Sequence, residues 1–430
     1  MARESVIDVV GVALAGYTEP SGVGRLATEY VTALGGEPQA TLIGSGRRTS
    51  VLHAAYANGT MSHALDFDPT WFPLNHPASP TIPGIMALAE LRSATWAQLI
   101  AAVVVAFEVQ GRLRLASTGQ HPGKGFHKPG TTGLIGAAAG CASILGLSPG
   151  QTLNALGIAA SRAGSLSINT GTMTKPSHAG HAARMGVESA LLAELGWTAN
   201  GDVFGPGGYF DTFLRGEAEP RLLVEGFGAP YRMVDPGVAL KKYPCNYYTQ
   251  RGIDAALAIR ERITPGLTIE AVNIVFPEFD HVDRPRPKTG LDGKFSVQFT
   301  AALALLDGKV TVDSFMDDQV RRPDVQDMLG RTTMTLDSSI PVDFPDTWTE
   351  VSVRLSDGSV VTERMQKLTG FHTPLSDEQI SGKFISCATR ALGDAAAVTL
   401  LRSLQQITPT ARVDTVTPLF GAPRIEEPAI

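Results

Sequence analysis

The chain has 430 residues and a formal net charge of −6 at pH 7, and 43% of its residues are hydrophobic against 18% charged. This length is sufficient for two domains with a substantial core. Because the chain is acidic and contains no long run of like charges, we expect neither nucleic acid nor a membrane surface as a partner; a cationic pocket for an anionic ligand would have to be built locally.

Helical patterns dominate the first half of the chain. Apolar residues recur at helical spacing in residues 5–16, 51–67, 82–92, 96–113, 132–146 and 182–196. Many of these segments are rich in Ala and Gly, which allows helix axes to approach closely. We therefore expect a mainly α fold whose large all-helical domain extends over residues 1–262.

The texture changes after residue 262. Residues 268–276 alternate apolar and polar side chains, and residues 349–365 read as two strands around a Ser-Asp-Gly turn. A helical pattern at 293–308 lies between them, so residues 263–375 predict a smaller α+β domain. A helix with Ser376 as its N-cap then follows. We expect the chain to return to the helical domain over 376–430, which makes the α+β domain an insertion.

The cysteines and the apolar segments indicate a cytoplasmic protein. Cys141, Cys245 and Cys387 lie far apart, with neither a CxxC pair nor the His/Cys spacing of a zinc site. Glu4 and Asp8 interrupt the N-terminal apolar stretch, and the longest apolar run, 97–107, is too short to cross a bilayer. We expect no export signal, no membrane insertion, no disulfide framework and no metal.

Four segments place ionisable residues at a Gly/Pro break beside a helix end. They contribute Asp66, Asp68, Thr70 and His76 from residues 63–84, His127 from 123–140, Lys175 from 171–180, and Lys241 with Lys242 just before Pro244. Each residue alone could be an ordinary cap, turn or solvated side chain. Together they supply the groups needed to bind carboxylates and move protons.

Lys175 has no acidic residue near it in the sequence, so we expect the substrate to be its partner. His178 and His181 could face the same way on a helix, but with no third ligand nearby we favour ordinary helix polarity over a metal site. The sequence contains neither a GxGxxG after a strand nor a GxxxxGK[ST] loop, so nucleotide chemistry is unsupported.

Five ordered segments resemble the successive signatures of the MmgE/PrpD family; they cover residues 63–90, 125–148, 171–186, 241–256 and 294–308. Members of this family include 2-methylcitrate dehydratase, cis-aconitate decarboxylase and iminodisuccinate epimerase. The resemblance runs from about residue 5 to 400. It implies a helical domain with an inserted α+β lid, a homodimer, and an active site in the cleft between the domains without metal or organic cofactor.

The resemblance also implies the site residues. The family's motif positions fall on Asp66, Thr70, His76, His127, Lys175 and Lys241, all of the expected residue type. The chain departs from the pattern at Pro69, which replaces the usual acid before the threonine, and in beginning within the family's first helix. We expect the first departure to reshape the pocket rim and the second to bear on packing or dimerisation.

The family's reactions move a proton on carbon next to a carboxylate. Lys175 and Lys241 would hold substrate carboxylates and spread the charge of the transition state. His76 and His127 would be general acid and base, in an order that the sequence leaves open, while Asp66 and Thr70 would orient a histidine or receive a substrate hydroxyl. The wall of the pocket would depend on lid residues such as those near His281.

We therefore expect a cofactor-independent lyase that acts on a small tricarboxylate. Dehydration of a 2-methylcitrate-like hydroxy acid is placed ahead of decarboxylation of cis-aconitate. One alternative is an epimerase of an imino- or amino-dicarboxylate. Another, of a different class, is a non-catalytic dicarboxylate-binding protein.

Overall fold

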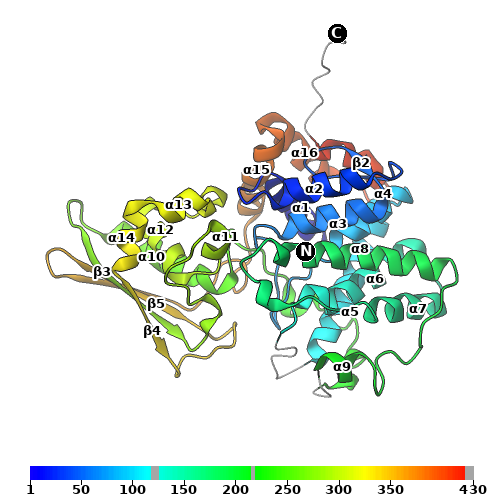
Figure 1. Ribbon diagram of the computed structural model, residues 1–430, viewed down its shortest axis with the longest axis horizontal. Coiled ribbons are helices and arrows are strands. Elements are labelled where there is room, and N and C mark those ends of the chain that lie inside the picture. The colour runs from blue at the N-terminus through cyan, green and yellow to red at the C-terminus, as the bar shows by residue number, and fades with distance from the viewer. Residues whose placement is uncertain (118–124, 215–217, 422–430) are drawn as a thin grey trace, which may run out of the picture.

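The computed structural model describes residues 1–117, 125–214 and 218–421. Figure 1 shows two parts side by side: stacked helices, and a smaller part in which helices cover a twisted sheet. Among the described residues, no helix combines the length and apolarity required to cross a bilayer. The fold is mainly α, as expected from the sequence.

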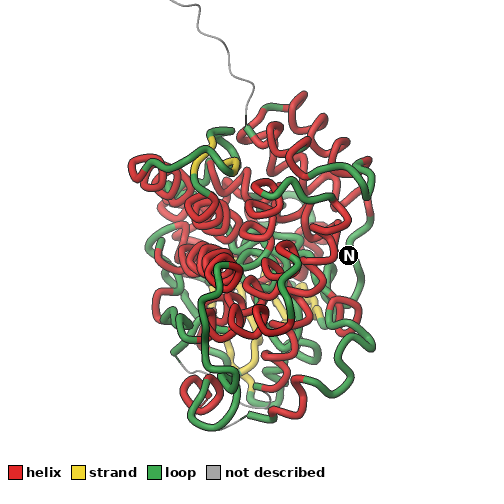
Figure 2. The backbone as a smooth tube through the Cα atoms, turned by 90° about the vertical axis from the view of Figure 1, so that its right-hand side faces the viewer, coloured by secondary structure: helices red, strands yellow, loops and turns green. Residues whose placement is uncertain are grey.

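The helical part contains the six helical segments predicted from the sequence. Its helices are α1 (Ala2–Tyr17), α2 (Val23–Leu34), α3 (Val51–His63), α4 (Ile82–Leu91), α5 (Trp96–Ala116), α6 (Thr132–Leu145), α7 (Pro149–Ala160), α8 (Thr174–Glu194), α9 (Tyr209–Leu214), α15 (Asp377–Leu392) and α16 (Asp394–Gln406). The two-residue strands β1 (Ala40–Thr41) and β2 (Arg48–Thr49) pair antiparallel and were not expected. Helices make up most of the face seen in Figure 2.

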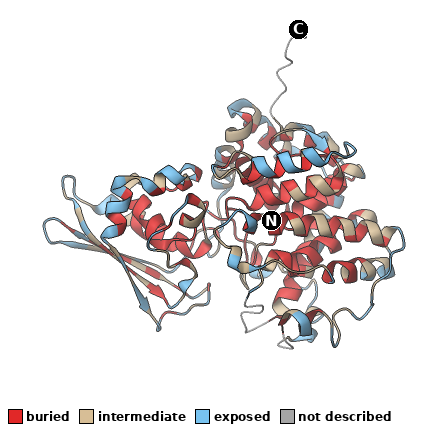
Figure 3. Cartoon of the chain, viewed as in Figure 1, coloured by how far each residue is buried: buried red, intermediate tan, exposed pale blue. Residues whose placement is uncertain are grey.

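Small residues let α3, α6 and α8 pack in close contact. A Cβ atom on Gly180 would lie 2.2 Å from Thr60 Oγ1 and 2.3 Å from the Tyr56 carbonyl oxygen, and one on Gly186 would lie 2.3 Å from Ala137 Cβ. Only glycine fits at these contacts. The close approach expected from the Ala- and Gly-rich composition is confirmed, and buried residues gather where these helices face one another (Figure 3).

The α+β part is built on a four-stranded sheet. Its strands are β3 (Ile269–Pro277), β4 (Thr332–Asp337), β5 (Thr349–Leu355) and β6 (Val360–Met365), in the order β4-β3-β5-β6. Strand β3 runs parallel to β4 and antiparallel to β5, and β5 and β6 form the predicted hairpin. Strand β4 was not predicted: Met334 and Leu336 alternate with polar residues, but this pattern is short, and no residue of this edge strand is fully buried.

One core joins the sheet to its helices, which are α10 (Gln250–Arg262), α11 (Gly290–Gly293), α12 (Val297–Asp307), α13 (Asp317–Arg321) and α14 (Pro323–Gly330). Val272 and Ile274 of β3 belong to the same buried cluster as Ile253 of α10 and Phe299 of α12. This cluster begins at Ala239 in the sequence. The expected domain boundary at 263 stays a prediction, and the packing of α10 favours a boundary nearer Ala239.

The chain returns to the helical part through α15. Ser376 caps this helix, its side chain accepting a hydrogen bond from the Gln379 backbone amide, as the N-cap prediction required. Phe384 and Ala388 of α15 belong to the same core as α1 and α3. The α+β part is therefore inserted between helical segments, while its action as a lid stays a prediction.

Candidate active site

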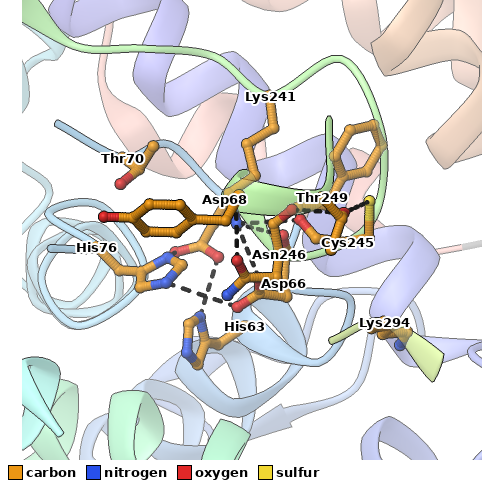
Figure 4. Close-up of polar contacts among 12 residues, drawn as sticks. His63, Asp66, Asp68, Thr70, His76, Lys241, Cys245, Asn246, Thr249 and Lys294 are labelled. Atoms are coloured by element: carbon orange, nitrogen blue, oxygen red, sulfur yellow. Dashed lines mark hydrogen bonds and ion pairs between the residues drawn. The ribbon is translucent and has the colours of Figure 1, made fainter. Parts of the chain in front are cut away.

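Asp66 is the centre of a buried network at the end of α3. It lies in a left-handed turn, with φ at +50°, and only 2% of it is exposed. Lys175, in the first turn of α8, donates a hydrogen bond to Asp66 Oδ1. Lys241 Nζ lies 2.9 Å from Asp66 Oδ2 and 2.5 Å from the Asp66 carbonyl oxygen (Figure 4).

The expectation that Lys175 lacks an acidic partner in the protein is wrong. The partner is Asp66, 109 residues earlier in the sequence, which packing of α3 against α8 brings to it. Burial alone would raise the pKa of Asp66, but Lys175 and Lys241 outweigh it and hold that pKa well below its ordinary value. Burial lowers the pKa of Lys175, and Asp66 opposes this shift. One buried carboxylate thus binds two buried ammonium groups.

A second carboxylate, Asp68, binds two histidines. Its Oδ1 lies 2.9 Å from His63 Nδ1, and its Oδ2 lies 3.1 Å from His76 Nδ1. The other ring nitrogen of His76 lies 3.5 Å from Asp66 Oδ1. His76 therefore has a carboxylate oxygen at each ring nitrogen. Asp68 is fully buried, which would raise its pKa, but His76 and His63 hold that pKa well below its ordinary value.

His127 continues this row of imidazoles. Its ring centroid lies 5.4 Å from that of His63, and its Nδ1 lies 3.1 Å from Nδ1 of His178, so one of these two nitrogens carries the shared hydrogen. Burial, with Lys175 as the next cause, holds the pKa of His127 well below its ordinary value and lowers that of His178 to about 4. At neutral pH both rings are uncharged, and His127 can accept a proton.

Thr70 and Lys241 take positions behind the cavity wall. The Thr70 hydroxyl donates to the Asn75 carbonyl oxygen at 2.7 Å rather than to a histidine, and its backbone pairs with Ala239. Lys241 is 1% exposed and also donates to the Cys245 carbonyl oxygen at 3.4 Å. The backbone pairing of Thr70 with Ala239 joins the loop after Asp66 to the segment that carries Lys241. Both residues thereby fix the shape of the site.

Two buried residues of the site were not singled out from the sequence. His63 closes α3, and burial lowers its pKa to about 4 although Asp68 opposes that shift. Lys294 belongs to the α+β part and donates from Nζ to the Ala64 carbonyl oxygen at 3.0 Å. His63 opens the very segment that supplied Asp66, and Lys294 opens the last of the five family-like segments. A search for every ionisable residue within these segments would have found both His63 and Lys294.

A cavity of about 510 Å³ lies against this network, between the two parts of the chain. The helical part contributes the ionisable residues His76, Arg114, His127, Lys128 and Lys175 to its wall, and the α+β part contributes Asn246, Tyr248, Phe279, Asp280, His281 and Phe295. Lys175 Nζ also lies 4.8 Å from the centre of the Phe295 ring. The expected wall residue His281 is thus present, whereas Lys241 lines a separate cavity of about 320 Å³.

His63, Asp66 and His76 could in principle share a metal ion, because their ligand atoms lie within 4.8 Å of one another. Both Asp66 oxygens, however, already accept hydrogen bonds from lysine ammonium groups. A divalent cation would face two positive charges at the same carboxylate. The donor set therefore suits ammonium groups and protons better than a metal.

Sequence comparisons agree with this architecture. Residues 1–221 match the MmgE/PrpD N-terminal domain, and residues 243–406 match the MmgE/PrpD C-terminal domain. The chain is 31% identical over 443 residues to cis-aconitate decarboxylase of Mus musculus, which covers 100% of this chain and 90% of the mouse protein. The human protein of that name is 31% identical over 441 residues, covering 100% of this chain and 91% of that protein.

A more distant relative carries another name. The 2-methylcitrate dehydratase of Cupriavidus necator is 25% identical over 405 residues, which covers 84% of this chain and 79% of that protein. The two matched domains together extend over most of the chain; Asp66, Asp68, their histidines and Lys175 fall in the first, and Lys241 lies between the two. The chain therefore belongs to the MmgE/PrpD family, and it is an enzyme of the lyase class.

Proposed function

We propose that the protein decarboxylates cis-aconitate without a metal or organic cofactor. The observation that carries this proposal is the cavity in which the Lys175 ammonium group meets the imidazoles of His76 and His127. The identity of 31% along the whole chain to two proteins named cis-aconitate decarboxylase supports this substrate, against 25% to a 2-methylcitrate dehydratase. It reverses the order that the motifs alone favoured.

Binding is the first step that the cavity supports. Its wall combines Lys175, Lys128 and Arg114 with three histidines, and Asp280 is the acidic residue in that wall. Burial, with Lys175 as the next cause, also lowers the pKa of His281 to about 4. A positive potential in a half-buried cavity favours a ligand with three carboxylates, and the attraction is stronger than in bulk water.

Decarboxylation then shifts two electron pairs along three carbons. The bond between the methylene carbon and its carboxyl carbon breaks, carbon dioxide leaves, and the pair forms a double bond to the central carbon. The former alkene pair shifts to the terminal carbon, next to its carboxylate, and that carbon takes up a proton. Lys175 stabilises the negative charge that develops on this carboxylate, commonly the largest catalytic contribution.

His76 is the proton donor in this proposal. Asp68 Oδ2 lies 3.1 Å from Nδ1 and orients the ring, while Nε2, 3.5 Å from Asp66 Oδ1, is the nitrogen that would transfer its proton to the substrate carbon. Burial holds the pKa of His127 well below its ordinary value, so it serves as a neutral hydrogen-bond partner. Decarboxylation needs one acid at carbon, which this pair supplies.

The test is turnover by the purified protein of cis-aconitate, 2-methylcitrate and iminodisuccinate, followed by carbon dioxide release, alkene absorbance and optical rotation. Carbon dioxide from cis-aconitate alone is the expected result. Turnover of iminodisuccinate would support the epimerase alternative instead. A non-catalytic binding protein would bind a polycarboxylate in calorimetry without turning it over. Lys175→Ala would weaken this binding, and neither wild type nor His127→Ala would show any reaction.

Dehydration of a 2-methylcitrate-like hydroxy acid is the second candidate, because His127 and His76 both line the cavity. Dehydration requires a base for the carbon-bound proton and an acid for the departing hydroxyl. An uncharged His127 beside His76 offers both functions. Appearance of alkene absorbance from 2-methylcitrate, without carbon dioxide, would decide for this reaction.

The homodimer stays a prediction of the family resemblance, and the cytoplasmic location stays a prediction from the cysteines and the apolar segments. Light scattering on the purified protein measures the first, as a mass of twice the 45.4 kDa of one chain. Fractionation of the source cells measures the second.

A further inference from the structure

Arg114 is a buried cation in the cavity wall for which the sequence suggested no role. It lies in the last turn of α5 and is 9% exposed. It lines both the main cavity and an adjoining pocket of about 10 Å³, which is large enough for roughly one water molecule. Its Nε donates to the Leu74 carbonyl oxygen at 3.5 Å, and no acidic side chain among the described residues forms an ion pair with it.

Arg112, one half-turn earlier on the same helix, shows how a structural arginine is satisfied. Its Nε donates to Glu108 Oε1 at 2.7 Å, and its two terminal nitrogens donate to the carbonyl oxygens of Glu225 and Gly226. Buried guanidinium groups are normally paired in this way, because an unpaired buried charge is costly. Arg114 is also buried, at 9% exposed, and in the part of the chain that the structure describes no carboxylate binds its terminal nitrogens.

The electrostatic surroundings of Arg114 are also positive. Burial lowers the pKa of Arg114 to about 10, so it stays charged at neutral pH. Burial, and then Arg114 itself, lowers the pKa of Lys128 to about 8. Lys128 lines both the main cavity and the small pocket beside Arg114. Two cationic side chains therefore lie together at one place in the cavity wall, which favours an anionic group there.

We propose that Arg114 binds one carboxylate of the substrate, as a second anchor besides Lys175. This inference rests on the proposed function, in which the substrate carries three carboxylates. The planar guanidinium fork matches a carboxylate through two parallel hydrogen bonds, a geometry that a lysine does not offer. The bond from Arg114 to Leu74 joins this anchor to the loop that carries His76, two residues further on. The anchor thereby sets where the substrate lies relative to the proton donor.

The test compares ligands that differ by one carboxylate. For the wild type, Arg114→Gln and Arg114→Lys, calorimetry gives the dissociation constants of methylmaleate, trans-glutaconate and methylenesuccinate. For cis-aconitate the KM is measured where the protein turns it over, and the dissociation constant where it does not. Each of the three dicarboxylates lacks a different carboxylate of the tricarboxylate. Arg25→Gln, which removes an exposed charge of α2, is the matched control for net charge.

We expect Arg114→Gln to weaken cis-aconitate binding by about 10- to 100-fold, the usual effect of losing a charged hydrogen bond. Binding of at least one dicarboxylate, the one that lacks the carboxylate held by Arg114, should weaken by less than about threefold, since that ligand makes no contact with Arg114 in the wild type. Arg114→Lys should recover part of the loss, because it restores the charge without the fork. The unfolding midpoint of unliganded Arg114→Gln should not fall, because the variant removes an unpaired buried charge.

Three results would overturn the inference. They are unchanged binding of cis-aconitate by Arg114→Gln, an equal loss for the tricarboxylate and all three dicarboxylates, and a lower unfolding midpoint in both Arg114 variants, which would indicate a structural arginine. Failure of the proposed function looks different. If wild type binds cis-aconitate but releases no carbon dioxide, the reaction is wrong while the anchor stands; if wild type turns it over and Arg114→Gln equals wild type, only the anchor is wrong.

Discussion

Replacing Asp66 by Asn should destabilise the protein strongly, because Asp66 is the counter-charge of two buried lysines. At the 2.9 Å that separate Lys241 Nζ from Asp66 Oδ2, the Coulomb attraction is about 6 kcal/mol at an effective dielectric constant of about 20. Desolvation offsets part of this, and removal of one partner of a buried pair typically costs about 3–5 kcal/mol. Asp66→Asn leaves both ammonium groups uncompensated, so we expect a loss at the upper end of that range.

The measurement is the free energy of unfolding from urea titrations, for wild type, Asp66→Asn and the double variant Asp66→Asn/Lys241→Met. The double variant should recover part of the loss, because it removes one of the two orphaned charges from a residue that does not line the main cavity. Glu29→Gln is the control: it breaks the exposed pair with Arg25 and should cost less than about 0.5 kcal/mol.

The same substitution has a signature in the pH dependence. The folded-state pKa of Asp66 lies well below that of the unfolded chain, so its contribution is fully present above about pH 4, the usual value for an aspartate, and is lost as the pH falls further. Wild type should therefore lose stability below pH 4 more steeply than Asp66→Asn. An Asp66→Asn protein within about 1 kcal/mol of wild type at pH 7 would refute the reasoning, because the lysines would then not depend on this carboxylate.

Further predictions concern the other groups of the site. His63→Asn should flatten the loss of stability between pH 6.5 and pH 4, since the folded pKa of His63 is lowered to about 4 and the neutral ring stabilises the fold above that window; urea titrations at several pH values should show a wild-type slope of up to about 1.4 kcal/mol per pH unit there. Lys175→Met should lower kcat/KM for cis-aconitate by at least about 100-fold, measured as carbon dioxide release, because it removes the charge that faces the developing carboxylate; an unchanged rate would exclude that role. Lys294→Met should lower kcat rather than raise KM, because Lys294 holds the Ala64 carbonyl oxygen beside Asp66 without lining the cavity; a pure KM effect would contradict this.

The sequence predicted those parts of the fold that local patterns determine. Strand β3 and the β5–β6 hairpin follow from alternation and a Ser-Asp-Gly turn, and the start of α15 follows from Ser376. Strand β4 was missed, because only Met334 and Leu336 carry its alternation and this pattern is too short to stand out. Local sequence patterns therefore predicted most helices and strands but not every pairing between strands.

The sequence could predict which residues belong to the site but not which of them bind one another. The resemblance indicated Asp66 and Lys175, but only the packing of α3 against α8 reveals that they bind each other across 109 residues of sequence. The turn after α3 folds Asp68 back onto His63, which no helical spacing would indicate. Arg114 lay one residue beyond the helical segment predicted at 96–113, where an arginine is ordinarily an exposed residue, and the structure extends α5 past it.

The glycine contact between α3 and α8 has a consequence for how the site can change over evolution. His63 closes α3 and Lys175 opens α8, and Gly180, only five residues beyond Lys175, rests on the Tyr56 carbonyl oxygen of α3. Gly180, which has no side chain, thus sets the distance between α3 and α8 and with it the distance between His63 and Lys175. Any side chain at Gly180 would act as a wedge, moving imidazole and ammonium apart while every reactive residue stayed in place. Loss of activity in a relative with an intact set of reactive residues could then originate at this spacer.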